Sequence, residues 1–315
     1  MSDLKQVLVL AGGLSPERDV SLQSGRYVID ALQRAGVDAV LRDTDATLLP
    51  ELADHPPSVA IPLLHGAAGE DGTVREVLQM ARVPYVGARP SACRAAFDKP
   101  TAKDVFAAAG IRTPAFVTLP KQAFHDYGVA ALTRRVIEHL GLPLVVKPRA
   151  GGSALGVTAV ESADQLAAAL VTAAGYHPDV LIEERVDGSE LAIAVAEIDG
   201  EPVALPPVEI VTPGGSYDYT ARYTSGLTDF RCPAPLDPGL LAEAGRTAVL
   251  AHRSLGLRHL SRTDAIATRE GDLYVLETNV APGMTATSTY PIALQAAGHH
   301  IAAFFKELAL QVLRG

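Results

Sequence analysis

The sequence of 315 residues contains no tryptophan, only two cysteines and only 5% aromatic residues. Cys93 and Cys232 lie far apart along the chain, which fits reduced thiols better than a disulfide framework or a zinc site. Basic residues are also in the minority, with 27 Lys and Arg against 36 Asp and Glu, and the formal net charge is −9. Because no basic stripe is visible, we expect no nucleic acid partner.

Long apolar runs are absent as well, and no segment of the sequence reaches membrane-spanning length. Residues 1–5 lack the apolar core of a signal peptide. We therefore expect no membrane association and a cytoplasmic location. The sequence contains no internal repeat and no low-complexity segment, and its length is sufficient for two or three α/β domains.

Two predicted strands near the N-terminus each end in a glycine-containing turn that leads into a helix. Residues 5–10 precede Gly12 and Glu17, and residues 59–64 precede His65. The free N–H groups of a helix N-terminus bind anions, and ligands of open α/β sheets lie at the ends of parallel strands. Neither turn has the Walker or the Gly-x-Gly-x-x-Gly spacing, so a Rossmann cofactor is not expected. Taken alone, Glu17 fits a simple helix-capping acid better than a ligand-binding residue.

A third glycine turn follows a predicted strand that carries a lysine. Residues 144–148 place Lys147 directly before a loop at residues 151–156 that contains three glycines. This arrangement is typical of a lysine that binds a nucleotide phosphate and a loop that folds over it. The alternative is a plain loop between two hairpin strands. Residues 180–190 then indicate a strand that runs into a connector, as in segments whose backbone binds adenine.

Oxygen ligands end two further predicted strands. Glu277 and Asn279 are two residues apart, so on an extended strand they face the same side. Hairpin pairing can bring the Asp264 carboxylate to them, and such an all-oxygen set suits Mg²⁺. The adjacent Arg262 can hold a phosphoryl group or an oxyanion. The alternative is a hairpin with ordinary exposed acids.

Taken in order, these motifs resemble the D-alanine–D-alanine ligases of the ATP-grasp superfamily, from about residue 6 to residue 300. The resemblance is carried by residues 12–25, 65–66, 70–72, 98–99, 146–148, 152–153, 217–219, 222–223, 262–264, 276–279 and 282–285. It implies an α/β ATP-grasp chain of three domains with an N-terminal doubly wound parallel sheet. ATP would lie between the central and C-terminal domains, with two Mg²⁺ ions for which Mn²⁺ can substitute. A homodimer is also implied.

The resemblance assigns roles residue by residue. The residues that it implies for ATP are Lys99, Lys147, Glu183, Glu184, Val186 and Glu190, and those for the metal ions are Asp264, Glu277 and Asn279. Glu17 would bind the ammonium group of the first D-amino acid, with Ser153 and Tyr223 as its hydrogen-bonded partners. His65 would be a further substrate-site residue. Arg262 and the Gly283 N–H would stabilise the oxyanion, and Ser288 would bind the second substrate's carboxylate.

Departures from the family pattern lie at the edge of the pocket. The family usually has a second serine where this chain has Ala154, a lysine at Arg222 and a leucine at Thr289. It commonly has a glycine at Ser261. No metal ligand, phosphate lysine or oxyanion arginine is lost, which argues against a non-enzymatic relative. We expect a D-alanine–D-alanine ligase that serves peptidoglycan synthesis. The alternative is a paralogous ligase or cyclase for another amino acid, and a D-lactate ligase fits less well because Tyr223 is kept.

The motifs also divide the chain. We predict an N-terminal domain at residues 1–87, a central domain at 88–184 and a C-terminal domain at 185–315. The turn-rich residues 213–227 form the predicted lid, since the acyl phosphate must be shielded from water. Apolar residues recur at helical spacing from Ile301 to Leu313, which indicates core or dimer packing.

Overall fold

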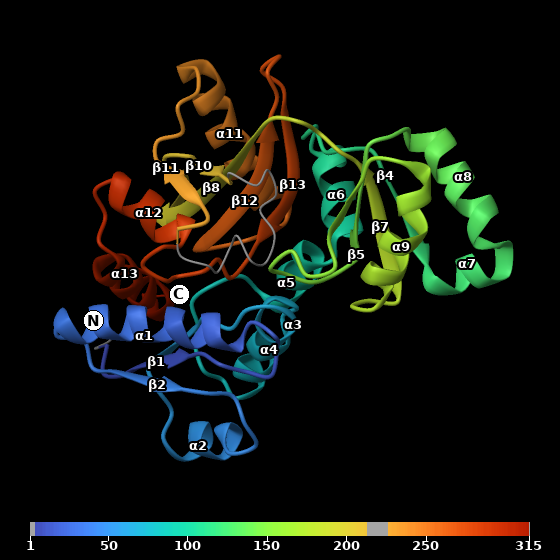
Figure 1. The fold of residues 1–315 in the computed structure, drawn as a ribbon. Helices are drawn as coiled ribbons and strands as arrows, with labels where there is room; N and C mark the ends of the chain where they lie inside the picture. The colour runs from blue at the N-terminus through green and yellow to red at the C-terminus, as the bar shows by residue number, and fades with distance from the viewer. Residues whose placement is uncertain (1–3, 213–225, 315) are drawn as a thin grey trace.

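The computed structural model describes residues 4–212 and 226–314, in which the strands form three β-sheets with helices on their faces (Figure 1). The sheets follow one another along the chain. None of the helices in these residues is both long and apolar enough to cross a membrane.

The first sheet is parallel, in the order β2-β1-β3. Its strands are β1 (Val7–Leu10), β2 (Ala39–Arg42) and β3 (Val59–Pro62). Its helices are α1 (Arg18–Arg34), α2 (Leu48–Asp54), α3 (Ala67–Glu70), α4 (Thr73–Met80) and α13 (Ile301–Arg314). Val7 and Val9 pack with α1 and α13, whereas Leu8 and Leu10 pack with α2 and α4 on the opposite face. The expected doubly wound sheet is confirmed.

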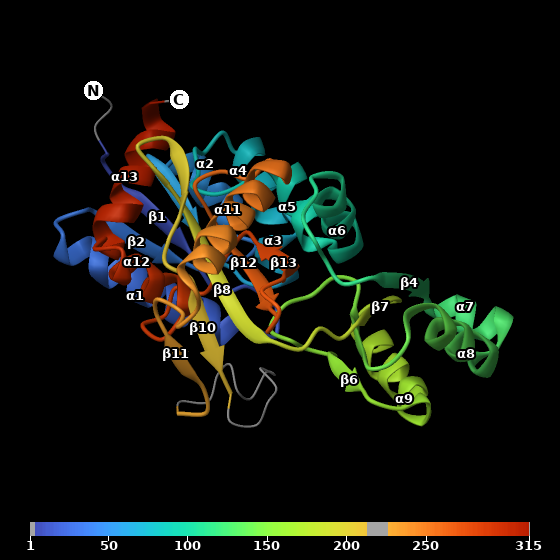
Figure 2. The same ribbon diagram turned by 90° about the horizontal axis from the view of Figure 1, so that it is seen from above.

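The second sheet is antiparallel, in the order β4-β7-β5-β6. Its strands are β4 (Phe116–Pro120), β5 (Leu144–Pro148), β6 (Thr158–Val160) and β7 (Asp179–Glu184). The helices beside it are α7 (Lys121–Tyr127), α8 (Val129–Leu140) and α9 (Ala163–Ala174). Figure 2 shows this unit set to one side of the molecule. The glycine loop at residues 151–156 joins two antiparallel strands, β5 and β6, as the alternative of a plain hairpin loop predicted.

The third sheet has the order β11-β10-β8-β12-β13, and β9 pairs with β8. Its strands are β8 (Ser189–Ile198), β9 (Glu201–Ala204), β10 (Val208–Val211), β11 (Asp229–Arg231), β12 (Leu260–Ala267) and β13 (Leu273–Asn279). The alternating residues of β8 separate two cores. Leu191 and Ile193 face helix α11 (Pro238–Ser254), and Ala192 and Ala194 face helix α12 (Thr289–Ala296).

Two helices that lie between the first and second sheets in the sequence pack against the third sheet. They are α5 (Pro90–Phe97) and α6 (Lys99–Ala108). Cys93 and Phe106 share a core with Val275 on β13, although we predicted residues 88–184 as a central domain. Phe305 and Leu308 of α13 likewise join the first and third sheets in one core, so the helical pattern near the C-terminus reflects core packing. The predicted domain boundaries stay a prediction.

Candidate active site

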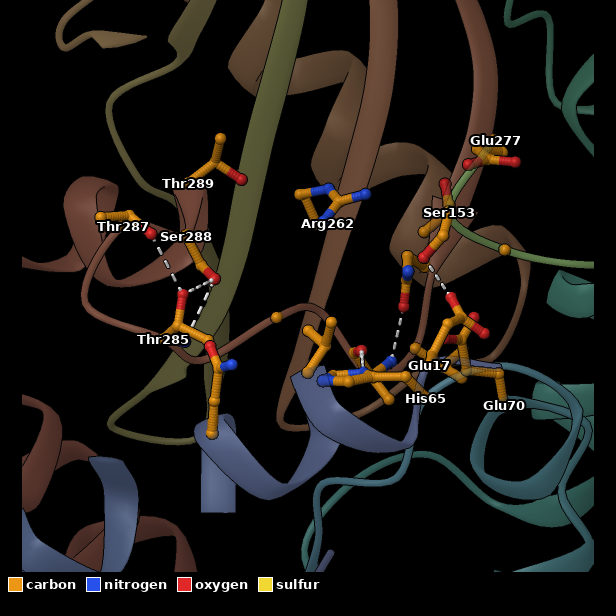
Figure 3. A pocket seen from close by; sticks show the side chains of 18 of the residues that line it. Glu17, His65, Glu70, Ser153, Arg262, Glu277, Thr285, Thr287, Ser288 and Thr289 are labelled. Atoms are coloured by element: carbon orange, nitrogen blue, oxygen red, sulfur yellow. Dashed lines mark hydrogen bonds between the residues drawn. The ribbon is translucent and has the colours of Figure 1, made fainter. Parts of the chain in front are cut away.

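A cavity of about 480 Å³ lies where the first sheet, the glycine loop and the β12–β13 hairpin meet. Figure 3 shows it from close by. The predicted site residues that line it are Glu17, His65, Lys99, Ser153, Arg262, Glu277, Asn279, Gly283, Ser288 and Thr289. Residues from widely separated parts of the chain therefore meet in one pocket.

Glu17 joins the N-terminal sheet to the glycine loop. The residue precedes α1 and is buried, and its carboxylate accepts a hydrogen bond from Ser153 Oγ (Figure 3). Two glycines close around this carboxylate: a Cβ at Gly66 would lie 2.1 Å from Glu17 Oε2, and one at Gly152 would lie 2.7 Å from Oε1. Both positions need glycine for this close approach. The loop over the pocket is thus held by a direct contact, as the resemblance implied for this pair.

His65 follows β3 and is buried in the wall of the pocket. Its Nδ1 lies 2.9 Å from the Ala281 carbonyl, which can only accept, so Nδ1 carries the proton. Its Nε2 lies 3.1 Å from Ser24 Oγ, which itself accepts a hydrogen bond from Met284 N. Burial lowers the pKa of His65 to about 4, partly opposed by the Ala281 hydrogen bond. The neutral ring therefore ties the turn after β13 to helix α1.

Glu70 is a pocket residue to which the sequence reasoning assigned no role. It is 6% exposed, and its Oε1 accepts a hydrogen bond from Gly66 N at 3.0 Å. Burial, followed by the nearby charge of Glu17, raises the pKa of Glu70 from 4.5 to about 8. Figure 3 shows the two carboxylates close together. The signal was present in the sequence, because Glu70 belongs to the motif that begins at His65.

The β12–β13 hairpin carries four predicted residues on one face. Arg262 lies opposite Asn279, and Asp264 lies opposite Glu277, as the expected hairpin required. Arg262 donates two hydrogen bonds to Asp264, at 2.6 and 2.7 Å. Asn279 Oδ1 accepts a hydrogen bond from Ala281 N at 2.8 Å. Asp264 is buried beneath Arg262 and does not itself line the cavity.

The lysines of the site form ion pairs with carboxylates. Lys99 Nζ lies 3.0 Å from Glu277 Oε2 and donates a hydrogen bond to the Gly151 carbonyl at 2.7 Å. Lys147 Nζ lies 2.5 Å from Glu183 Oε1. A third lysine, Lys103, lies 2.8 Å from Glu183 Oε2 and was missed by the sequence reasoning. Its position four residues after Lys99 on α6 was the available signal.

The other residues that the resemblance implied for ATP do not line the cavity. Glu183 and Glu184 end strand β7, Val186 follows them half-buried, and Glu190 lies at the start of β8. The Glu183 side chain is buried. Burial alone would raise the pKa of Glu183, but the charges of Lys147 and Lys103 hold it below its usual range. Tyr223 and most of the predicted lid lie outside the described residues.

The opposite end of the cavity is built around the start of α12. Ser288 precedes this helix, and its Oγ accepts a hydrogen bond from Thr285 N at 3.1 Å. A Cβ at Gly283 would lie 2.9 Å from Ser288 Oγ, so Gly283 brings its backbone close to that hydroxyl. Thr289 is 6% exposed and lines the pocket. A helix N-terminus at this place suits a carboxylate.

Comparisons with known proteins agree with this arrangement. Family models described as the D-ala D-ala ligase N-terminus and C-terminus match residues 42–88 and 105–310. A D-alanine--D-alanine ligase from Bordetella petrii is 41% identical over 94% of this chain and 88% of that protein. One from Pelotomaculum thermopropionicum is 38% identical over 93% of this chain and 92% of that protein. This chain belongs to the D-alanine–D-alanine ligase family.

Solved structures extend the likeness to the fold of this ligase. The D-alanyl-alanine synthetase A of Vibrio cholerae has a TM-score of 0.88 and 26% identity, and the match covers both chains completely. The VanG D-Ala:D-Ser ligase of Enterococcus faecalis has a TM-score of 0.82 and 27% identity over 99% of this chain and 100% of that one. The ligase therefore has the ATP-grasp fold, and the family uses ATP.

Proposed function

We propose that the protein joins two D-alanine molecules into D-alanyl-D-alanine and converts ATP to ADP and phosphate through an acyl phosphate. One observation carries this proposal: a single cavity combines the Glu17–Ser153 pair, Lys99, Arg262 and a helix start at Ser288. These are sites for an ammonium group, a phosphate, an oxyanion and a carboxylate.

The first amino acid would bind at the N-terminal corner. The Glu17 carboxylate would take its ammonium group, and Ser153 would hold Glu17 and the glycine loop in place. The carboxylate of this amino acid would then attack the γ-phosphoryl group of ATP and displace ADP. Enclosure of the pocket matters at this step because acyl phosphates hydrolyse, and the predicted lid at residues 213–227 with Tyr223 would complete the enclosure.

The second amino acid would bind at the start of α12. Ser288 and the helix N-terminus would take its carboxylate and leave its amine directed at the acyl carbon. Attack by the free amine forms a tetrahedral intermediate whose collapse releases phosphate. Arg262 and the Gly283 N–H would stabilise the oxyanion of that intermediate.

The nucleotide would lie between the second and third sheets. Glu183 is buried, and its carboxylate lies 2.5 Å from Lys147 Nζ and 2.8 Å from Lys103 Nζ. The exocyclic amine of adenine would be a further donor to this carboxylate. Glu184 and Val186 would contact adenine through their backbone, Glu190 would take the ribose hydroxyls, and Lys99 and Lys147 would bind phosphates.

The hairpin side chains fit Mg²⁺ in their chemistry. The described residues hold no group of three or more His, Cys, Asp or Glu side chains placed to bind a metal. Asp264, Glu277 and Asn279 supply two carboxylates and an amide oxygen, a set that phosphate oxygens and water would complete. Two such ions, or Mn²⁺ in their place, would neutralise the charge of the transferred phosphoryl group.

The cellular role follows from the product. D-Alanyl-D-alanine is a building block of peptidoglycan, so we propose a cytoplasmic enzyme of cell-wall synthesis, active as a homodimer. A second candidate is a ligase that takes another second amino acid. It is favoured by Thr289, a buried polar residue in the cavity wall beside Ser288.

The test is phosphate release from Mg-ATP across a panel of D- and L-amino acids, with mass spectrometry of the products. We expect turnover with D-alanine alone and the D-alanine dipeptide as product. Arg262→Met provides the inactive control, and Glu270→Gln, an exposed residue outside the cavity, provides the active one. Turnover only when a different amino acid is added would replace the proposal with the second candidate.

A further inference from the structure

Helix α6 presents two lysines on one face, and they reach different sheets. Lys99 and Lys103 are four residues apart, so they lie one above the other on the helix. Lys99 contacts Glu277 on β13 of the third sheet, and Lys103 contacts Glu183 on β7 of the second sheet. Figure 1 shows α6 between these two sheets. Lys99 has a role by resemblance, whereas Lys103 has none.

Lys103 is completely buried, which is costly for an ammonium group. Its side chain is 0% exposed. Its Nζ donates a hydrogen bond to Thr113 Oγ1 at 2.6 Å and lies 5.3 Å from the centre of the Phe116 ring. Burial lowers the pKa of Lys103 to about 8, although Glu183 opposes this shift, so the group is mostly charged at neutral pH. Apolar replacements for buried ion pairs are often as stable as the pair itself, so stability alone does not explain this lysine.

The charges around Glu183 do not balance. Lys147 Nζ lies 2.5 Å from one carboxylate oxygen, and Lys103 Nζ lies 2.8 Å from the other. Two cations share one anion, so the cluster carries a net charge of +1. Without Lys103 the remaining Lys147–Glu183 pair would be neutral, and its lysine would be fully committed to the carboxylate. A nucleotide phosphate would then meet no excess positive charge from this sheet.

We propose that Lys103 is a positioning residue of the nucleotide site, which holds the Glu183 carboxylate in place and supplies the excess positive charge that lets Lys147 bind a phosphate. The inference rests on the proposed use of ATP by this chain. Lys103 acts through Glu183 and Lys147 rather than on the reacting atoms. Its loss should therefore weaken nucleotide binding and leave the amino-acid sites unchanged, since it does not line that cavity.

The test is calorimetric binding of ADP with magnesium to the wild type and to Lys103→Met, together with steady-state KM values for ATP and D-alanine. We expect ADP binding to weaken roughly 10- to 100-fold, by analogy with the loss of an outer partner of a metal ligand. KM for ATP should rise and KM for D-alanine should stay constant. Lys306→Met, at an exposed position on α13, is the matched control and should behave as wild type.

A double variant separates this role from mere packing. Lys103→Met with Glu183→Gln leaves Lys147 alone and restores a net charge of +1, and glutamine still offers an acceptor oxygen. It should bind ADP more tightly than Lys103→Met does. If Lys103→Met does not fold, as thermal unfolding would reveal, Lys103→Gln keeps a polar group near Thr113 and takes its place under the same criteria.

The outcomes are distinguishable. A wild type that does not bind ADP overturns the proposed use of ATP, and this inference with it. Unchanged ADP binding in a folded Lys103 variant overturns this inference alone. Equal losses for ADP and D-alanine, or no recovery in the double variant, also overturn it, because both indicate a general distortion of the pocket.

Discussion

Substitution of Glu70 by glutamine is expected to stabilise the protein at neutral and alkaline pH. The folded protein keeps the proton of this carboxyl, whose pKa is raised from 4.5 to about 8, chiefly by burial and then by Glu17. The unfolded chain releases that proton above pH 4.5. The stability contributed by the protonated Glu70 carboxyl is therefore fully present below pH 4.5, and it is lost as the pH rises through 8.

The size of the effect follows from these two pKa values. At pH 7 the wild type is destabilised by about 3 kcal/mol relative to a side chain that cannot ionise, at 1.36 kcal/mol per pKa unit. Glutamine at position 70 is such a side chain, and its carbonyl can still accept the Gly66 N–H. The gain should shrink to a few tenths of a kcal/mol at pH 4.5. An active-site pocket that keeps a destabilising carboxyl at neutral pH fits the general compromise between stability and function.

The assay is urea unfolding at pH 5, 7 and 8, with the free energy of unfolding extrapolated to water. Glu270→Gln, at an exposed site, is the control and should show no pH-dependent gain. A Glu70→Gln protein that is less stable than the wild type at pH 8 would refute the reasoning. So would a stability difference that stays constant with pH.

Four further predictions concern the same pocket. Ser153→Ala should raise KM for the first D-alanine about 10-fold or more, because it frees the glycine loop from Glu17, and ADP binding should not change. A rise of similar size in the ADP dissociation constant would contradict this. Burial lowers the pKa of His65 to about 4, so protonation of the unfolded chain should lower the free energy of unfolding by about 2 kcal/mol between pH 7 and pH 5. Urea unfolding of His65→Gln should lack this pH-dependent loss. Arg262→Lys should lower kcat about 100- to 1,000-fold in the coupled phosphate assay if its fork stabilises the oxyanion, and near-normal kcat would remove that role. Thr289→Leu should change the apparent affinity for the second amino acid more than that for ATP, and equal changes in both KM values would argue against a role in that subsite.

Local patterns were sufficient to predict the elements that carry the site. The predicted strand at residues 5–10 and the one that ends at Glu277 and Asn279 became β1 and β13 within a few residues of the expected bounds. Pairing of Asp264 with Glu277 followed from hairpin geometry. The contact between Glu17 and Ser153 spans 136 residues, and only resemblance to a family predicted it.

The remaining features depend on burial, which sequence spacing does not report. Lys103 and Glu70 are residue types that usually lie in solvent, and only the packing of α6 and α3 encloses them. Ser261 departs from the family's usual glycine, and its hydroxyl lies 2.8 Å from Nδ1 of the buried His252. The sequence alone does not predict this partner, because the two residues meet only after α11 packs on β12.

The spacing of the two lysines on α6 also constrains how this helix can change in length. Each residue of an α-helix turns the chain by about 100°. One residue inserted between Lys99 and Lys103 would leave the first lysine against β13 and rotate the second away from β7. Helix α6 therefore has a fixed register, and the single turn between its two cations must keep its length.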